Sequence, residues 1–417
     1  MPAAEPPPTG SRSILSAGRD LRTCTAFGIA SFANVLLPYI IFSGLYLIIP
    51  FPQPVVLLIE LLPALTIKLI FPHILHHIRR WVWPLLLVGC WTLAAFATTA
   101  APPNVTTPIR ILIAVLASAS TATAEVFFLS QLSHYGKTAL AGWGTGTAVA
   151  GALCAILPTV LTIHMGLVLR NSTVYVYYLL LATATAYFLV LPPPTCYKQD
   201  DWAADDELPS EVESQKLALL PAESPSVISF WERFHDNLQL TSSKLLRLCI
   251  YPLLLVTTAQ VLASSGRSRP SAMLPIFPRY AEFSAAYGMA FQLGNLIARS
   301  TALLFRAKRP RLIFALLVFC SIVTILDTAF ILLSNAYFVF SIVFAIGWTG
   351  GMMYMNVYST AMEYLSRNPD ADAEFALGSI GVGETAGILI GSLAGVTFES
   401  QLCGLANRSG RWCSTVT

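Results

Sequence analysis

The stretch from Ser118 to Leu157 constrains the fold more than any other part of the chain. It reads as two long apolar helices joined by a short polar turn at 133–137, with one carboxylate, Glu125, in the first helix and several glycines in the second. An acid that faces a glycine-lined helix is unusual in a water-soluble core but common inside membrane transporters, where small residues let helices approach closely. The stretch therefore predicts a helical protein embedded in a membrane.

The composition of the whole chain agrees with this prediction. Of its 417 residues, 55% are hydrophobic and only 11% are charged, which is too few to cover a water-facing surface. The basic residues fall at predicted helix ends rather than in one patch, so we expect no nucleic-acid partner. The cysteines show no metal-ligand spacing, and the sequence predicts neither a metal nor a cofactor.

Apolar segments long enough to cross a membrane predict about eleven transmembrane helices in an all-α polytopic protein. The predicted helices are 26–48, 55–74, 82–100, 108–132, 139–164, 173–191, 247–264, 280–304, 311–331, 336–358 and 374–400.

A long acidic segment divides these helices into two groups, as in the major facilitator architecture, where substrate binds between two helical halves. We expect five regions. They are a disordered cytosolic tail at 1–25, a six-helix half at 26–191, a cytosolic linker at 192–246, a five-helix half at 247–400 and a polar tail at 401–417.

Charge bias and glycosylation motifs predict the orientation of the chain. More of the Lys and Arg residues in short loops fall on one side if the N-terminus is cytosolic, as the positive-inside rule requires. The N-glycosylation motifs at Asn104, Asn171 and Asn407 all fall on the opposite side in that orientation, so these residues are glycosylation candidates.

Charged residues within the predicted helices are the first candidates for a functional site, because each is costly to place in a bilayer. Glu125 shares one helix face with Ser118 and Thr121, and a carboxylate in an apolar groove suits a proton acceptor. The alternative is a structural, hydrogen-bonded acid. Glu60 and Lys68 occupy the second predicted helix, where each either serves transport or pairs with a neighbour to lock helices together.

The helix at 280–304 carries a second group of polar residues along one stripe. Gln292, Asn295 and Arg299 recur at helical spacing, so they face either a partner helix or a water-filled cavity. Arg299 keeps its charge and could bind an anionic group of a substrate, although it could also reach toward the cytosolic interface. Glu384, in the last predicted helix, is a further candidate.

Glycines at four-residue spacing predict close helix packing. Gly142 and Gly146 form one such step, and Gly383, Gly387, Gly391 and Gly395 form three consecutive steps in the last helix. Small residues at this spacing allow backbones to approach. The alternatives are packing alone, which is the simpler interpretation, and sliding between conformations.

Several segments together resemble the battenin family of membrane proteins. They are AEVFFLSQLSHYGKTALAGWGTGTAVAGA (124–152), LLPALTIKLIFP (61–72), FQLGNLIARST (291–301) and GGMMYMNVYSTAMEYLSRNPDADAEFALGSIGV (350–382), which includes the Y-x-N element ending at Asn356. The resemblance implies residence in the vacuolar or lysosomal membrane and a role in vacuolar pH homeostasis. It also implies handling of basic amino acids, as for fungal relatives, or of glycerophosphodiesters, as for animal ones. It marks Glu125 and Arg299 as interior polar residues.

These observations favour a transporter that is not an enzyme, with the lipid bilayer, a small polar solute and protons as its partners. The alternative is a regulator or scaffold that acts on the proton pump or on trafficking proteins. Such a scaffold has no need of the polar stripe at 280–304. An intramembrane lipid enzyme ranks third, because it would need a catalytic dyad at one membrane depth.

Overall fold

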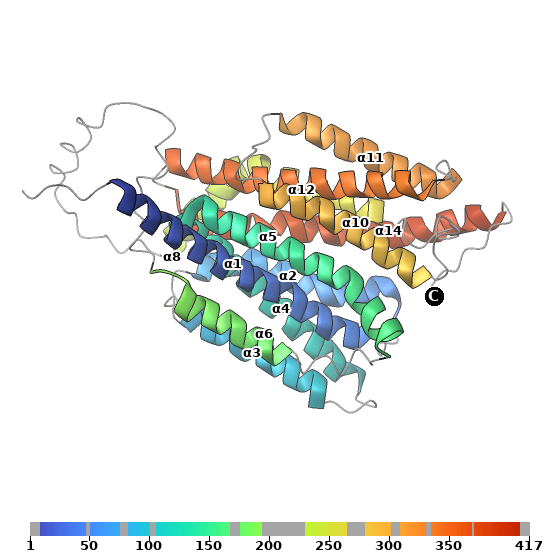
Figure 1. Ribbon diagram of the computed structural model, residues 1–417, viewed down its shortest axis with the longest axis horizontal. Coiled ribbons are helices and arrows are strands. Elements are labelled where there is room, and N and C mark those ends of the chain that lie inside the picture. Colours follow the sequence, from blue (N-terminus) through green and yellow to red (C-terminus); the bar gives the residue numbers. More distant parts are fainter. Residues whose placement is uncertain are drawn as a thin grey trace, which may run out of the picture.

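Long apolar runs in lipid fold as helices, because a helix satisfies its backbone polar groups within one segment. The computed structural model is accordingly a bundle of long helices (Figure 1). It describes residues 9–46, 51–75, 82–100, 106–166, 176–193, 230–264, 280–301, 309–330, 335–368 and 371–408.

Six helices form the N-terminal half. They are α1 (Thr9–Tyr46), α2 (Gln53–Ile74), α3 (Val82–Ala100), α4 (Thr107–Ser130), α5 (Leu132–Thr159) and α6 (Val176–Thr185). The last two continue into wider π-helical turns at Val160–His164 and Ala186–Val190.

The C-terminal half begins with a helical segment made of α8 (Phe230–Leu240), a π-helical stretch (Thr241–Ile250) and α9 (Tyr251–Ser264). It continues with α10 (Tyr280–Thr301), α11 (Pro310–Phe330), α12 (Ala336–Arg367), α13 (Ala373–Ser379) and α14 (Gly381–Arg408).

Each of the eleven predicted segments contains helix. Within the described residues, nine helices are long and apolar enough to cross a membrane, and a further apolar helix, Tyr177–Val190, is shorter. The polar stripe lies on α10, outside those nine. The chain is a multi-pass membrane protein, while the number of crossings stays a prediction.

Two predicted boundaries differ from the structure. The first helix begins at Thr9 rather than at 26, so much of the expected disordered tail is helical. The prolines near the N-terminus end at Pro8, and the residues that follow carry none until Pro38. The predicted linker also ends early, because the amphipathic sequence FWERFHDNLQL forms α8. Residues 194–229 of that linker lie outside the described residues.

The predicted turn between the fourth and fifth helices is shorter than expected. Only Gln131 separates α4 from α5, and the chain bends inside α5 at Gly136, where φ is 68° and ψ is −152°. Glycine adopts this left-handed region at no steric cost, which explains its place within the polar sequence SHYGK.

The two halves lie side by side in the bundle. Figure 1 shows α3 and α6 on one flank, α11 and α12 on the other, and α5 and α10 between them. Within the halves α1 packs on α5, α2 on α4, α10 on α12 and α9 on α14. Across the halves α5 contacts α10, α2 contacts α14, and α13 contacts α2, α4 and α5. The start of α1 and the end of α14 lie at opposite ends of the bundle.

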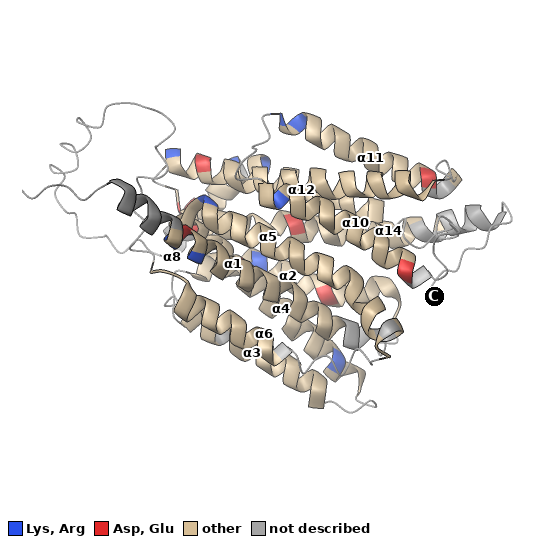
Figure 2. Cartoon of the chain, viewed as in Figure 1, with Lys and Arg blue, Asp and Glu red and all other residues tan. Residues whose placement is uncertain are grey.

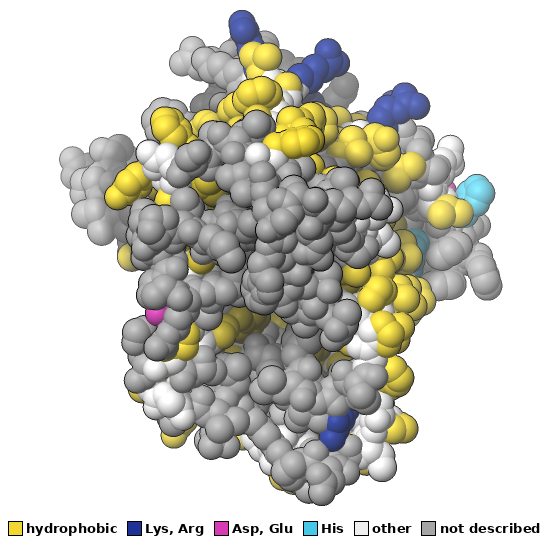
Figure 3. Space-filling view, turned by 90° about the vertical axis from the view of Figure 1, so that its right-hand side faces the viewer, with side chains coloured by type: hydrophobic (Ala, Val, Ile, Leu, Met, Phe, Trp, Pro, Cys, Tyr) yellow, Lys and Arg dark blue, Asp and Glu magenta, His cyan; other side chains and the backbone are white. Residues whose placement is uncertain are grey.

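The outer surface suits a lipid environment. Large hydrophobic side chains such as Leu93, Phe96, Leu181 and Phe319 are more than half exposed. Charged residues are sparse along the middle of the helices (Figure 2), and the described side chains visible around the bundle in Figure 3 are mostly hydrophobic. Apolar residues that face outward are in contact with acyl chains when the bundle crosses a bilayer.

Candidate functional site

An ion pair joins α2 to α4 inside the N-terminal half. Lys68 Nζ lies 2.6 Å from Glu125 Oε1, and the two side chains are only 4% and 15% exposed. Each charge compensates the other, so removing one partner of such a pair costs about 3–5 kcal/mol. The sequence marks both residues as candidates but does not pair them, because helix packing decides which face of α2 meets α4.

The predicted common face of α4 is turned toward α2. The Ser118 hydroxyl donates a hydrogen bond to the backbone oxygen of Glu60, and Glu125 projects to the same neighbour. Thr121, which lies between them, donates to Ala117 O of its own helix at 2.9 Å. The Glu60 side chain is partly buried on α2, and its backbone rather than its carboxylate receives Ser118.

Lys68 also reaches the C-terminal half. Its ammonium donates to the backbone oxygen of Gly381 at 3.4 Å, at the start of α14. A Cβ atom added to Gly381 would lie 2.7 Å from Glu125 Oε1, so the chain can approach the ion pair here because this residue is glycine. Glu384 lies one turn further along α14 and interacts electrostatically with Glu125, Lys68 and Arg299.

Arg299 is held by contacts to both halves. Its guanidinium carbon lies 4.2 Å from the centre of the Tyr354 ring on α12, and its Nη1 donates to the Thr147 hydroxyl on α5. A cation over an aromatic face is worth about 0.5–2 kcal/mol. The side chain is thus engaged inside the bundle. Asn356, two residues beyond Tyr354, is partly buried on α12.

The rest of the α10 stripe is pressed against glycines of neighbouring helices. Gln292 lies beside Gly151 of α5, and Asn295 beside Gly351 of α12, where an added Cβ would fall within 2.7 Å of each side chain. Asn295 Nδ2 donates to Gln292 Oε1 at 3.4 Å, while Asn295 Oδ1 is buried with no hydrogen-bond partner among the described residues. The stripe faces partner helices in this conformation.

The remaining glycine candidates lie at close helix contacts. A Cβ at Gly142 or Gly146 would collide with the α1 backbone near Cys24 and Gly28. A Cβ at Gly383, Gly387 or Gly391 would collide with residues of the helical segment from Ile250 to Val261. Gly395 is buried further along α14. These contacts require small residues.

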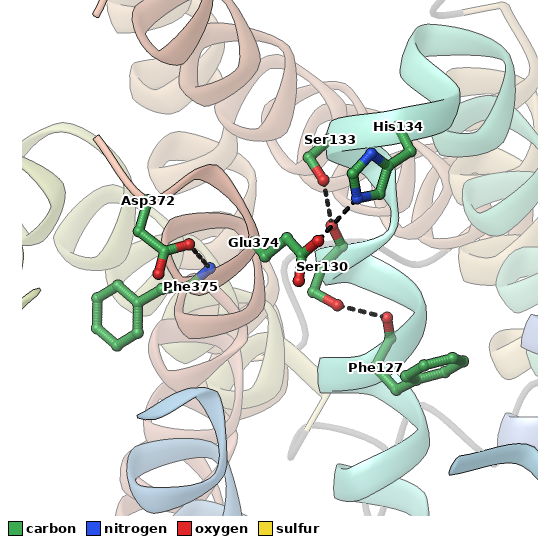
Figure 4. Close-up of polar contacts among 7 residues, drawn as sticks. All are labelled: Phe127, Ser130, Ser133, His134, Asp372, Glu374 and Phe375. Carbon is green, nitrogen blue, oxygen red and sulfur yellow. Dashed lines mark hydrogen bonds and ion pairs between the residues drawn. The ribbon is translucent and has the colours of Figure 1, made fainter. Parts of the chain in front are cut away.

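A second polar cluster lies at the end of the bundle at which α1 begins (Figure 1), and Figure 4 shows its contacts. His134 Nε2, in the first turns of α5, lies 2.7 Å from Glu374 Oε1 of α13. Asp372 caps α13 by accepting from the backbone N–H of Phe375, and the Phe375 ring lies 4.7 Å from the ring of His73 at the end of α2. The predictions omitted His134 and Glu374, because neither lies deep in an apolar segment.

A small cavity lies within the N-terminal half. Its volume is about 30 Å³, and its lining comes from α1, α3, α4 and α6 and is mostly apolar. The Asn34 side chain lines it, with an oxygen that is buried and has no hydrogen-bond partner among the described residues. A space of this volume holds about two water molecules.

Some sequence candidates lie beyond what the structure describes. Asn104 and Asn171 lie outside the described residues, and the side chain of Asn407 is not described. Among described side chains, no group of three His, Cys, Asp or Glu residues is arranged to hold a metal ion.

The interior therefore contains a cluster of four charges from four helices. Lys68 and Glu125 come from the N-terminal half, and Arg299 and Glu384 come from the C-terminal half. We call these four residues the charge cluster. Two cations and two carboxylates at the contact between two helical halves can bind charged groups of a solute, and the carboxylates can also accept protons.

Comparison with protein families identifies one match over nearly the whole chain. The model of the family described as CLN3 protein matches residues 13–405. The protein BTN1 of Yarrowia lipolytica is 31% identical over 404 residues, spanning 93% of this chain and 96% of that protein. The protein btn-1 of Neurospora crassa is 28% identical over 403 residues, spanning 88% and 84%.

Among solved structures, a similar fold is that of FucP, a major facilitator superfamily transporter in the outward conformation. The TM-score is 0.53 at 14% sequence identity, with 93% of this chain and 98% of FucP covered. At that identity the likeness establishes the fold alone. The predicted major-facilitator-like architecture is confirmed.

Proposed function

We propose that this chain, which belongs to the CLN3 protein family, carries small polar solutes across a vacuolar or lysosomal membrane in a process coupled to protons through Glu125. At a coarser level the protein is transporter-like, since it combines that family with a major-facilitator-like fold. The proposal adds a compartment, a solute class and a coupling ion.

The buried pair of Lys68 and Glu125 carries the proposal. Burying an ion pair between two helices in lipid costs desolvation free energy, and apolar packing would stabilise the same contact as well or better. A carboxylate that is paired with a cation which also touches the other half of the chain can link its own protonation to the arrangement of the halves. A passive scaffold has no need of such a residue.

The proposed solutes are basic amino acids or glycerophosphodiesters, the classes implied by the family resemblance. The charge cluster offers groups for both. Its carboxylates suit a cationic side chain, and Arg299 suits a carboxylate or a phosphodiester. Release or uptake of such solutes with protons would contribute to vacuolar pH homeostasis.

We further propose that the N-terminus is cytosolic and that Asn104, Asn171 and Asn407 are glycosylated on the lumenal side. The charge bias of the sequence supports that orientation. Single Asn→Gln variants of these residues, followed by their mobility on gels before and after enzymatic deglycosylation, test the assignment. A smaller mobility shift than that of the parent protein is expected in each variant, and an unchanged shift in all three would refute the assignment.

The deciding experiment measures solute uptake into sealed vesicles that contain only this purified protein, with a pH gradient imposed. Arginine, lysine and glycerophosphodiesters are compared with a neutral sugar. We expect saturable, gradient-dependent flux that loses its pH dependence in Glu125→Gln. The matched control is Glu363→Gln, which removes an exposed carboxylate paired with Arg367 on α12 and should leave flux unchanged.

The opposing outcome is equally informative. No flux of any solute by folded protein, under either gradient direction, would reject transport and favour a regulator that acts on the proton pump or on trafficking proteins. Flux whose pH dependence persists in Glu125→Gln would keep the carrier and reject the proton role of this residue.

A further inference from the structure

Lys68 lies at the meeting point of the two halves. Its ammonium contacts Glu125 of α4 at 2.6 Å and the Gly381 oxygen of α14 at 3.4 Å, and its side chain is 4% exposed. An ammonium has three donors, so one of them remains available after these two contacts. The lysine therefore bridges the N-terminal half to the start of α14.

A second carboxylate stands next to that bridge. Glu384 is in the first turn of α14, three residues after the carbonyl that Lys68 touches. It interacts electrostatically with both members of the ion pair and with Arg299. The N-terminal end of a helix also favours negative charge. Lys68 therefore contacts one acid directly, Glu125, and touches α14 one helical turn before a second acid, Glu384.

We propose that Lys68 is shared between Glu125 and Glu384, and that it moves from the first carboxylate to the second when Glu125 binds a proton. The structure holds the Glu125-bound state. Protonation adds a hydrogen to a Glu125 oxygen and removes its negative charge, so the ammonium loses the attraction that holds it there. An ionised Glu384 then becomes its partner. Loss of the proton returns the lysine to Glu125.

The other groups at the cluster favour this exchange. Arg299 lies on the C-terminal side but is engaged by the Tyr354 ring and the Thr147 hydroxyl. Tyr354 and Tyr358 of α12 are buried, with ring centres 4.9 Å apart, and the Tyr358 hydroxyl has no hydrogen-bond partner among the described residues. Arg299 therefore has partners of its own on α12 and α5.

The exchange rests on the proposed function for its purpose, because a proton-driven carrier needs a link between protonation and the packing of its halves. Its physical content is independent of transport. If Lys68 has two acidic partners, its removal must have opposite effects on stability depending on whether either acid remains.

The experiment measures melting temperatures of the purified full-length protein in detergent. Lys68→Met is introduced into Glu125→Gln and into the double variant Glu125→Gln/Glu384→Gln. In the first background we expect the melting temperature to fall by on the order of 2 °C or more, since Glu384 loses the cation that is proposed to move to it. In the second we expect a rise of similar size, since an unpaired buried ammonium is removed.

Lys137→Met, which removes an exposed cation of α5, is the matched control and should act alike in both backgrounds. A rise in both backgrounds would overturn the proposal, because it would show that Glu384 does not support Lys68. A fall in both, or no shift in either, would also overturn it. The melting temperatures are measured in the absence of solute, so they test the exchange of Lys68 between the two acids. Transport is tested separately by flux into vesicles, so the two proposals can fail independently.

Discussion

His134 and Glu374 meet at 2.7 Å where the α4–α5 connection packs against α13, so a residue of the N-terminal half binds a residue of the C-terminal half. Ser130 lies below this contact and is fully buried, and a Cβ at Gly378 of α13 would lie 3.8 Å from its Cβ. The end of the bundle at which α1 begins is therefore closed in this conformation. Alternating access would require this contact to open.

Glu374→Gln is expected to loosen that closed end. Both side chains are about a quarter to a third exposed, so the contact contributes at most about 1 kcal/mol, which corresponds to up to about a fivefold change in the open fraction. We expect Ser130→Cys to react with a maleimide up to about fivefold faster in the Glu374→Gln background. Glu363→Gln is the control background, and the parent without Ser130→Cys corrects for native thiols. Equal rates in the two backgrounds would show that the contact between His134 and Glu374 does not keep this end of the bundle closed.

Arg299→Ala is expected to weaken transport of solutes that carry a carboxylate or phosphate more than transport of solutes without one. Of the two cations in the charge cluster, the Arg299 guanidinium can form two parallel hydrogen bonds to a carboxylate or phosphate, whereas the Lys68 ammonium cannot match that geometry. Arg299→Lys keeps the charge and should recover only part of the difference. Half-saturation concentrations in vesicles are the measurement. A uniform loss for all solutes would assign the residue a structural role.

Tyr354→Leu is expected to release Arg299 from its aromatic partner, whereas Tyr354→Phe keeps the ring. The loss of the cation–π contact should cost about 0.5–2 kcal/mol. We expect a lower melting temperature and a higher half-saturation concentration for anionic solutes in the leucine variant than in the phenylalanine variant. If the two variants behave alike, the Tyr354 ring does not hold Arg299.

Gly387→Leu is expected to disrupt packing of α14 on α9. An added side chain would collide with the Thr257 hydroxyl and would lie 2.6 Å from the Leu254 oxygen even at its Cβ. Overpacking of this kind typically costs about 1–3 kcal/mol. Ile390→Leu, at an exposed position of the same helix, is the control. Size-exclusion profiles and melting temperatures should separate the two, and a Gly387→Leu protein indistinguishable from the control would contradict the tight contact.

Much of the fold could be predicted from the sequence, because hydropathy alone locates helices in a bilayer. All eleven predicted segments contain helix, and the battenin-family resemblance is confirmed by the family match. The errors fall where the chain leaves the apolar runs. α1 starts in the polar sequence after Pro8, and α8 is amphipathic, so hydropathy did not reveal either.

The site could be predicted only as a set of isolated residues. Each intramembrane charge is visible in the sequence because it interrupts an apolar run, so the sequence predicts Lys68, Glu125, Arg299 and Glu384 as candidates. Their pairing depends on which helices are in contact and on how each helix is rotated about its own axis. A single sequence contains little of that information. Tyr354 was missed as the partner of Arg299, because a tyrosine in an apolar helix resembles any other packing residue.

The charge cluster contains two cations and two carboxylates, so with both acids ionised its charges sum to zero. A conformational change that moves the whole cluster across part of the membrane field then moves no net charge, whereas each uncompensated elementary charge would feel about 2.3 kcal/mol per 100 mV. Any voltage sensitivity of flux that arises at this site consequently reports the charge of the cargo and its protons. The electrical stoichiometry of transport can be read from reversal potentials, with no correction for a gating charge from these four residues.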